Sequence, residues 1–530
     1  MAARGFDPKA LAGKVPAPDR HVELLIIGAG LAGTTAAIEA ARGGARVLLI
    51  DENPVDAAMM GLDAPLYYGG RYTSAVQTKA RMLEQVFAAN PLLEEAFEAG
   101  VEVELGVYCW GAWVNGPGLA ALPEPLAGLA DEERAWMVGF ERLIVATGAR
   151  DVAFAFRGWD QPGVMGAAAL HALVRTYDAF SGRRLAILGS GRLALETALF
   201  AHDRGLEVAA LIEAGEAVHG PADLAAKLKD AGTPILTGHA PVRAEGGLHG
   251  VEGLTVRRLA DGAEHRLTCD TVVQAIGVTP VIDLLDVLGA RLAMQPGLGG
   301  HAPVSPDGTA TSLDNVFLAG NVAGAPGGAW LSDSEARASG ARAARAALGE
   351  KDSPVLRPAE GEDAVAYQQA WMRALMAVTP ADVILCQCED VSREALLGVH
   401  QPAYLGAPGA ALALRDLARL LEDGPADQDQ IKRLTRACMG PCQARRCREQ
   451  VALALACASN ADATSIPLAG YRAPIRPLPL SVLAAWDEAP AMSNHWDVWF
   501  GIPTQWTPYE DIGTEREALY VDILGGDMHL

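Results

Sequence analysis

A glycine-rich turn near the N-terminus constrains this chain more than any other feature of its sequence. Residues 21–53 read HVELLIIGAGLAGTTAAIEAARGGARVLLIDEN, in which a first apolar run, the turn and an Ala-rich stretch precede a second apolar run ending at Asp51. This order predicts strand, helix and strand, with a dinucleotide pyrophosphate at the helix N-terminus. Gly28 permits the tight turn, Gly30 lets the backbone approach the phosphates, and Gly33 lets helix and strand pack closely. The residues expected to bind the cofactor here are Gly28, Gly30, Leu31, Ala32, Gly33, Asp51 and Glu52.

A second segment of the same kind spans residues 183–216 and reads RRLAILGSGRLALETALFAHDRGLEVAALIEAGE. Gly189 and Gly191 hold the glycine positions of a G-x-G-x-x-A turn, and Glu213 lies near the end of the second predicted strand. The segment predicts a bound nicotinamide or adenine nucleotide, but a retained fold with an empty or blocked site fits the sequence equally well. No adjacent basic pair follows Glu213, so NAD is favoured over NADP if either binds.

Three further segments resemble the strands and turns that join the two nucleotide folds of a flavoprotein class. ERLIVATGAR (141–150) and NVFLAGNVAG (315–324) are similar to its FAD-domain segments, and CDTVVQAIGVTP (269–280) is similar to its strand returning from the NAD domain. The resemblance implies an α/β fold with two Rossmann-like domains, the second inserted in the first. The expected limits are 20–150 and 285–350 for the FAD-binding domain and 151–284 for the NAD(P)-like nucleotide-binding domain.

The same resemblance implies further FAD contacts at Thr147, Gly148, Gly320 and Asn321. Position 321 is usually an Asp that bonds the ribityl chain, and an amide can still donate and accept hydrogen bonds there. Ser332 and Glu335 then form an S-x-x-E capping box, which predicts the start of a helix. In the flavoproteins such a helix points its N-terminus at the isoalloxazine, where negative charge develops on reduction.

Five of the eight cysteines lie in two short segments of the C-terminal half. ILCQCEDVSREALLGV carries Cys386 and Cys388, and IKRLTRACMGPCQARRCREQ carries Cys438, Cys442 and Cys447. Such clustering in a chain without a disulfide scaffold indicates metal binding. Four soft thiolate ligands suit an iron–sulfur cluster. A structural zinc site is the alternative, although zinc favours C-x-x-C pairs and none occurs.

These two segments resemble the bacterioferritin-associated-ferredoxin type of [2Fe-2S] domain, which is expected over residues 380–455. The resemblance implies that the cluster ligands are Cys386, Cys388, Cys442 and Cys447. Cys438 takes a position usually held by Gly, so it is a spare thiol or an alternative ligand. Cys109 and Cys269 are isolated, and the missing redox C-x-x-C pair argues against a disulfide reductase.

Taken together, these motifs resemble the flavoprotein α subunit of the opine oxidase, hydrogen cyanide synthase and hydroxyproline dehydrogenase group. QPGVMGAAALHAL (161–173) and YRAPIRPLPLSVLAA (471–485) belong to the same resemblance. It implies an electron-transferring subunit whose partner, a second flavoprotein of β type, oxidises an amine, amino acid or imino acid at a C–N bond. A stand-alone NADH-dependent reductase is the alternative, and a third possibility is a role in assembly or sensing. No residue is assigned as general acid, general base or nucleophile.

The formal net charge of −22 disfavours nucleic-acid and anionic-membrane surfaces. No apolar stretch is long enough to span a membrane, and the N-terminal segment lacks the apolar centre of a signal peptide. We therefore expect a cytoplasmic protein that has no transmembrane segment and binds no nucleic acid.

Two regions have no clear counterpart in the resemblance. Gly69 and Gly70 hold the place of a turn near the flavin, with Arg71 and Tyr72 where that turn would meet it, but a surface loop fits the sequence equally well. The C-terminal extension, residues 456–530, ends in a tail rich in Trp, which predicts a subunit interface or packing on its own domain. The Trp residues of the tail are Trp486, Trp496, Trp499 and Trp506.

Overall fold

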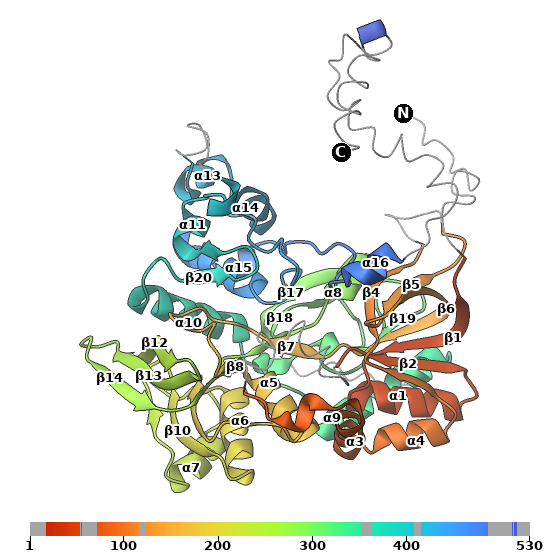
Figure 1. Cartoon of the computed structure of the whole chain (residues 1–530), viewed down its shortest axis with the longest axis horizontal. Coiled ribbons are helices and arrows are strands. Elements are labelled where there is room, and N and C mark those ends of the chain that lie inside the picture. Colours follow the sequence, from red (N-terminus) through yellow and green to blue (C-terminus); the bar gives the residue numbers. More distant parts are fainter. Residues whose placement is uncertain are drawn as a thin grey trace.

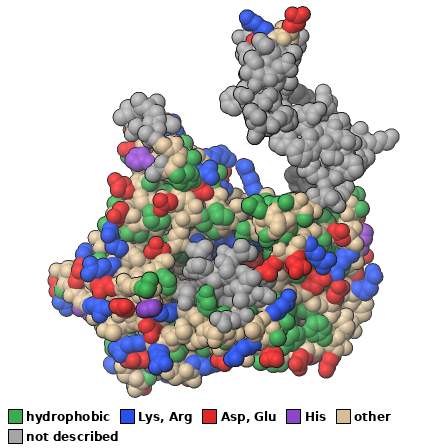
Figure 2. Space-filling view, viewed as in Figure 1, with side chains coloured by type: hydrophobic (Ala, Val, Ile, Leu, Met, Phe, Trp, Pro, Cys, Tyr) green, Lys and Arg blue, Asp and Glu red, His purple; other side chains and the backbone are tan. Residues whose placement is uncertain are grey.

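The computed structural model describes most of the chain in a few continuous stretches. They are residues 17–53, 55, 71–115, 122–350, 362–406, 415–485, 511 and 514–516. The glycines at 69 and 70 and the Trp-rich tail lie outside the described residues. Figure 1 shows two α/β units side by side, with a smaller helical unit above the second. Figure 2 shows acidic and basic side chains interspersed over the face in view.

The first unit is a seven-stranded sheet in the order β3-β2-β1-β6-β5-β4, with β19 beside β6. Strands β1, β2, β3, β6 and β19 are parallel, and β4 and β5 run antiparallel at one edge. The apolar run 24–27 is buried because helices cover both faces of the parallel part. The strands are β1 (Arg20–Ile27), β2 (Val47–Asp51), β3 (Glu102–Leu105), β4 (Tyr108–Trp113), β5 (Leu126–Ala130), β6 (Ala135–Val145) and β19 (Val316–Leu318).

Helices α1 (Leu31–Arg42) and α9 (Asp333–Ala347) pack tightly against each other beside this sheet (Figure 1). Gly340 makes the close approach possible, because a Cβ there would overlap the backbone of Ala32. The capping box predicted for Ser332 and Glu335 is confirmed at the start of α9. The other helices of this unit are α3 (Lys79–Ala89), α4 (Leu92–Glu98) and α8 (Asp283–Leu288).

The second unit has a five-stranded parallel sheet in the order β11-β10-β9-β15-β8 and a three-stranded antiparallel sheet, β12-β13-β14. A two-stranded ladder of β7 (Ala149–Asp151) and β16 (Val278–Pro280) joins it to the first unit. The strands are β8 (Val164–Gly166), β9 (Arg184–Leu188), β10 (Glu207–Ile212), β11 (Ile235–Leu236), β12 (His239–Gly247), β13 (Gly250–Arg258), β14 (Glu264–Thr268) and β15 (Thr271–Gln274). The helices are α5 (Ala167–His171), α6 (Arg192–Asp203) and α7 (Ala222–Asp230).

The small unit that carries the clustered cysteines is mainly helical. Helix α10 (Ala364–Val378), which the sequence analysis did not predict, packs against α15. One apolar core continues from the second unit through Trp371 of α10 to Leu455 of α15. The other elements of this unit are β20 (Ile384–Cys386), β21 (Val391–Ser392), α11 (Arg393–Leu397), α13 (Leu417–Asp423), α14 (Gln428–Thr435) and α15 (Arg448–Ala458). The chain then returns to the first unit, where α16 (Leu480–Ala484) lies near β4 (Figure 1).

The predicted α/β dinucleotide-binding fold is confirmed, since both glycine-rich turns lie between a parallel strand and a helix. Cluster binding by the helical unit remains a prediction. Within the part of the chain that the structure describes, no helix is both long and apolar enough to cross a membrane.

Candidate functional site

The first glycine-rich turn opens into a cavity. Gly28 has φ +108°, which favours Gly, and Gly30 is the N-cap of α1. A Cβ built on Gly30 would meet no atom within 4 Å. The Ala29 N–H donates to Asp51 Oδ2 at 2.6 Å, so the carboxylate is held beside the turn. Burial raises the pKa of Asp51, although the backbone N–H of Ala29 opposes that shift.

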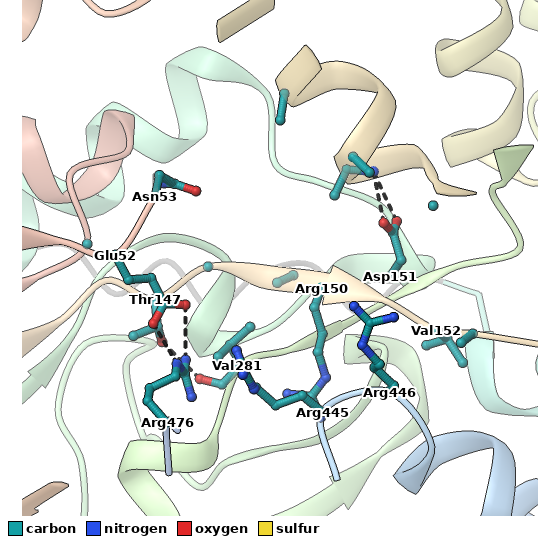
Figure 3. Close-up of a pocket in the computed structure, with 18 of the residues that line it drawn as sticks. Glu52, Asn53, Thr147, Arg150, Asp151, Val152, Val281, Arg445, Arg446 and Arg476 are labelled. Carbon is teal, nitrogen blue, oxygen red and sulfur yellow. Dashed lines mark hydrogen bonds and ion pairs between the residues drawn. The ribbon is translucent and has the colours of Figure 1, made fainter. Parts of the chain in front are cut away.

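The cavity has a volume of about 410 Å³ and is lined by residues from all three units. The predicted cofactor residues on its wall are Gly28, Gly30, Asp51, Glu52, Thr147 and Gly148. Figure 3 shows Arg445 and Arg446, from the second cysteine segment, on the same wall as Arg150 and Arg476. A nucleotide phosphate in this cavity would therefore meet positive charge as well as the helix N-terminus.

The other residues predicted for this site lie behind the wall rather than on it. Gly33 packs against Gly28, and Ala32 lies against Gly320. The Asn321 side chain donates to Gly324 O at 3.4 Å and accepts from Leu331 N at 3.3 Å. These residues shape the turn, and the cavity-lining set contains neither them nor Leu31.

A buried ion network closes one end of the cavity. Asp283, which is 1% exposed, pairs with Arg150 at 2.9 Å and with Arg476 at 3.0 Å. Arg476 also holds Glu52 through contacts of 2.5 and 3.1 Å (Figure 3). Arg150 in turn pairs with Glu449 at 2.9 Å. Burial alone would raise the pKa values of Asp283 and Glu52, but the neighbouring guanidinium groups hold both below their usual range.

Asp151 is the titratable group of the cavity whose pKa is shifted most clearly toward neutrality. Burial raises its pKa to about 7, although hydrogen bonds from the backbone N–H groups at the start of α5 lower it in part. Its two oxygens accept from Ala168 N at 3.1 and 3.0 Å (Figure 3). The side chain can therefore hold or release a proton inside the cavity near neutral pH.

The five clustered thiols come together beside this cavity. Cys447 Sγ lies 3.7 Å from Cys386 Sγ and 3.5 Å from Cys438 Sγ, and Cys388 is hydrogen bonded to Cys442. The structure therefore brings together all four predicted ligands and the fifth thiol. Backbone N–H groups also donate to these sulfurs, which tunes the potential of iron–sulfur clusters. The donors are those of Glu389 and Cys438 to Cys386, of Cys442 to Cys388 and of Arg446 to Cys442.

The thiol contacts centre on Cys447, which contacts Cys386, Cys438 and Cys442, and Cys442 in turn contacts Cys388. Among the described residues, no three His, Cys, Asp or Glu side chains converge as ligands of a single metal ion would.

The backbone of the cysteine turns is unusually constrained. Five non-glycine residues there have positive φ: Asp390 (52°), Arg436 (64°), Cys438 (70°), Gln443 (50°) and Ala444 (64°). The Cys438 value explains why a Gly is usual at this position in the domains that the segment resembles. Strain of this kind persists where the surroundings fix the turn, often at binding sites.

A buried cation lies next to the thiols in sequence. Arg448 is 1% exposed, and none of its side-chain nitrogens has a hydrogen-bond partner within the described part of the chain. Its guanidinium lies 3.8 Å from the centre of the Tyr471 ring. A buried guanidinium without hydrogen bonds is costly unless negative charge lies nearby, and this one lowers the pKa of Asp283.

The second glycine-rich turn is built like the first, but protein groups engage its carboxylate. Glu213 Oε2 accepts from Ser190 Oγ and from the Tyr367 hydroxyl, both at 2.6 Å. Glu213 Oε1 accepts from Gly215 N, also at 2.6 Å. Arg192, which directly follows Gly191 of the turn, pairs with Glu196 at 3.1 Å.

Arg71 contacts the second unit, which agrees with the loop alternative rather than with a turn at the flavin. Its guanidinium donates to the backbone oxygens of His249, Val251 and Asp270, all in the second unit, at 2.9–3.0 Å. Tyr72 forms a β-bridge with Phe180 and is 42% exposed. Neither side chain lines the cavity. The three backbone carbonyls accept hydrogen bonds from its Nε, Nη1 and Nη2, so the guanidinium is held away from the cavity.

Comparison with known proteins agrees with this architecture. The profile of the family described as "Pyridine nucleotide-disulphide oxidoreductase" matches residues 22–347. The chain belongs to this family. The match spans both glycine-rich turns and ends before the cysteine segments, which lie outside the family profile.

Curated relatives extend the similarity beyond that profile. The A subunit of opine oxidase from Rhizobium meliloti (strain 1021) is 28% identical over 495 residues, 87% of this chain and 98% of the relative. The HcnB subunit of hydrogen cyanide synthase from Pseudomonas aeruginosa is 27% identical over 476 residues, 80% of this chain and 90% of the relative. The alpha subunit of sarcosine oxidase from Corynebacterium sp. (strain P-1) is 28% identical over 311 residues, 57% of this chain and 30% of the relative.

Among solved structures, L-proline dehydrogenase from P. horikoshii has a similar fold. The TM-score is 0.56 at 19% sequence identity, and the similarity covers 88% of this chain and 81% of that one. This similarity in fold covers more of the chain than the family profile does.

Two of the eight cysteines in this chain, Cys109 and Cys269, lie in the two nucleotide-fold units. All eight are free. Cys109 and Cys269 are buried, and burial raises the pKa of each to about 12. Both thiols are therefore poor nucleophiles.

Residues of the site that the sequence did not predict include Arg150, Asp151, Asp283 and Arg476. Arg476 belongs to the YRAPIRPLPL segment, which was recognised only as a resemblance. Its partner Glu52 directly follows Asp51, so two adjacent carboxylates at the end of a predicted strand were the only sequence signal that a cation lies here. The contact joins positions 424 residues apart, which no local pattern reveals.

Proposed function

We propose that this chain is the electron-transferring α-type subunit of a multi-subunit dehydrogenase, with FAD at the first turn and a [2Fe-2S] cluster on the cysteine turns. A second flavoprotein subunit of β type would oxidise an amine, amino acid or imino acid at a C–N bond. Two relatives are named as the A subunit of opine oxidase and the alpha subunit of sarcosine oxidase, which supports both the reaction class and an assembly of several subunits. The domain limits and the cytoplasmic location given above are part of this proposal.

One observation carries the proposal: the cavity and the thiols share short segments of chain. Gln387 lies between Cys386 and Cys388 and lines the cavity, as do Arg445 and Arg446, which lie between Cys442 and Cys447. A flavin nucleotide and a cluster would therefore lie on opposite sides of the same turns. Electron transfer needs cofactors held at such close range.

The chain's own residues suit these cofactors. The open turn at Gly30 and the Asp51 carboxylate would hold the pyrophosphate and ribose of FAD. Arg445 and Arg446 place positive charge between the cavity and the thiols, which stabilises thiolates and added electrons. Asp151 can hold a proton in the cavity at neutral pH. Bound FAD and the cluster would supply two-electron and one-electron redox chemistry respectively.

An anaerobic absorbance and EPR titration of the purified chain with dithionite tests the proposal. The expected result is flavin absorbance, about two irons per chain and a rhombic S = 1/2 signal after reduction. Cys442→Ser should lose the iron and the signal. Cys457→Ser is the matched control, because Cys457 lies on α15, away from the thiol contacts, with its Sγ 3.8 Å from Gln369 O. Zinc without iron, or a chain without flavin, would overturn the assignment.

A further inference from the structure

The two nucleotide turns of this chain have nearly the same backbone. Gly28 and Gly189, which begin the turns, have φ of +108° and +110°. Gly30 and Gly191, the helix N-caps, have φ/ψ of −69°/178° and −67°/176°. The second turn therefore has the backbone that receives a pyrophosphate. What differs is what lies above it.

Protein atoms cover the second turn where the first is open. A Cβ built on Gly191 would lie 3.7 Å from both His219 and Tyr367, whereas the same construction on Gly30 meets nothing within 4 Å. Gly220 packs directly on the turn, because its N–H donates to Ser190 O at 2.8 Å. A Cβ on Gly220 would be 2.8 Å from Gly191 C, so the segment that carries His219 lies close against the turn.

The Tyr367 hydroxyl is inserted between the turn and its carboxylate. In the first fold the Ala29 N–H donates directly to Asp51. In the second, the N–H of Ser190 at the corresponding position donates to the Tyr367 hydroxyl at 3.0 Å, which donates to Glu213 at 2.6 Å. Glu213 is 1% exposed, so it cannot also receive ribose hydroxyls.

Tyr367 is itself held from two sides. Its ring stacks on His219 with the centroids 3.9 Å apart and the planes within 2°. It belongs to α10 of the cysteine-bearing unit. Gln369 of the same helix donates to Ala461 O at 2.7 Å and accepts from Ala463 N at 3.1 Å, so α10 is fixed to the segment that follows α15. Burial and the Glu213 carboxylate raise the pKa of Tyr367, so it remains a donor.

We infer that the second nucleotide fold of this chain binds neither NAD(H) nor another adenine nucleotide, because Tyr367 and His219 occupy its site. The fold serves instead as the receptor for α10 and so fixes the cysteine unit in place. This goes beyond the proposed function and concerns the second fold alone. It also means that a pyridine nucleotide cannot deliver electrons from this fold.

Isothermal titration of the full-length cofactor-containing chain with NADH tests the inference. Wild type should show no saturable binding at the second fold. Tyr367→Ala combined with His219→Ala should bind NADH saturably, with an affinity at least about tenfold above the detection limit that wild type fails to reach. Adding Gly191→Ala should remove that gain. Its Cβ has room in the native fold, with its nearest neighbours at 3.7 Å, but would obstruct a pyrophosphate.

Each outcome decides the inference. Wild-type binding that Gly191→Ala weakens would overturn it, and so would a folded double variant, judged by circular dichroism, that gains no binding. Wild-type binding that Gly191→Ala leaves unchanged lies elsewhere and supports closure of this fold. Flavin and iron contents measured on the same samples test the proposed function separately, so the two can fail independently.

Discussion

Removing one carboxylate from the ion network at the end of the cavity should loosen two segments of the chain. Asp283 is 1% exposed and faces two guanidinium groups at 2.9 and 3.0 Å. Replacing it by Asn keeps the shape but removes the negative charge that both arginines face. Breaking a buried pair in this way costs about 3–5 kcal/mol, because charge remains buried without its partner.

The structure places the cost at the lower end of that range. Arg150 retains Glu449, Arg476 retains Glu52, and Asn keeps one acceptor oxygen. We therefore expect about 3 kcal/mol, which is about 150-fold in the local opening equilibrium. The effect should be confined to α8 and the 471–476 segment, since Asp286 of α8 also accepts from Tyr471 N at 2.6 Å.

Hydrogen exchange read by mass spectrometry measures this directly, because it reports local opening free energies. The peptides of interest cover 283–288 and 471–476. Glu95→Gln is the control, since it breaks the exposed Arg42–Glu95 pair, whose side chains are 57% and 40% exposed. That pair should contribute less than about 1 kcal/mol. Equal effects of the two substitutions would refute the reasoning.

The pH dependence of this effect has a definite sign. The pKa of Asp283 lies below its ordinary value of 3.8 in the folded chain. Its stabilisation is therefore fully present above that value and is lost as pH falls through the folded pKa. The difference between wild type and Asp283→Asn should stay constant from pH 8 to pH 5. A difference that shrinks within that interval would contradict the assigned direction of the shift.

Three more substitutions test neighbouring groups. Arg448→Met should lower the reduction potential of the proposed cluster by about 60 mV, a tenfold change in a one-electron equilibrium, as measured by EPR-monitored redox titration. Arg433→Met, at a guanidinium that is 65% exposed, should change it little. Cys438→Gly should keep the iron content and relieve the positive φ, whereas Cys447→Ser should lose iron; loss of iron in Cys438→Gly would make Cys438 a ligand. Asp151 has a raised pKa of about 7, so its stabilisation falls as pH rises from about 4 through 7. In wild type the free energy of unfolding should therefore fall by about 2 kcal/mol between pH 4 and pH 7, about half of what the full pKa shift would give, because the carboxylate faces the cavity. Asp151→Asn should remove this fall, as measured by thermal unfolding across that pH range.

The parts of this molecule that the sequence predicted are those that a continuous segment specifies. Each strand–turn–helix–strand unit is complete within about 35 residues, so periodicity and glycine spacing suffice to recognise it. The thiols were recognised because their ligand type is rare and clustered. The fold and the first turn therefore followed from local rules.

The contacts that decide how the two sites behave could not be predicted in this way. Tyr367 reaches Glu213 across 154 residues, and Arg476 reaches Glu52 across 424. Both come from elements outside the two nucleotide segments, where a Tyr or Arg looks like an ordinary amphipathic residue. An occupied and a blocked second site were therefore equally compatible with the sequence, because Tyr367 lies outside the motif.

The distribution of arginine gives the two sites a common physical basis. In a chain of net charge −22, the arginines near the thiols and the cavity face buried or partly buried groups. Arg476 and Arg150 neutralise the buried carboxylate of Asp283, and Arg448 lies buried near Asp283 without a hydrogen-bond partner among the described residues. Arg445 and Arg446 line the cavity between the thiol segments. Buried positive charge is costly without a counter-charge. The charges of these arginines are therefore best compensated when an anionic ligand lies in the cavity and the thiols are ionised.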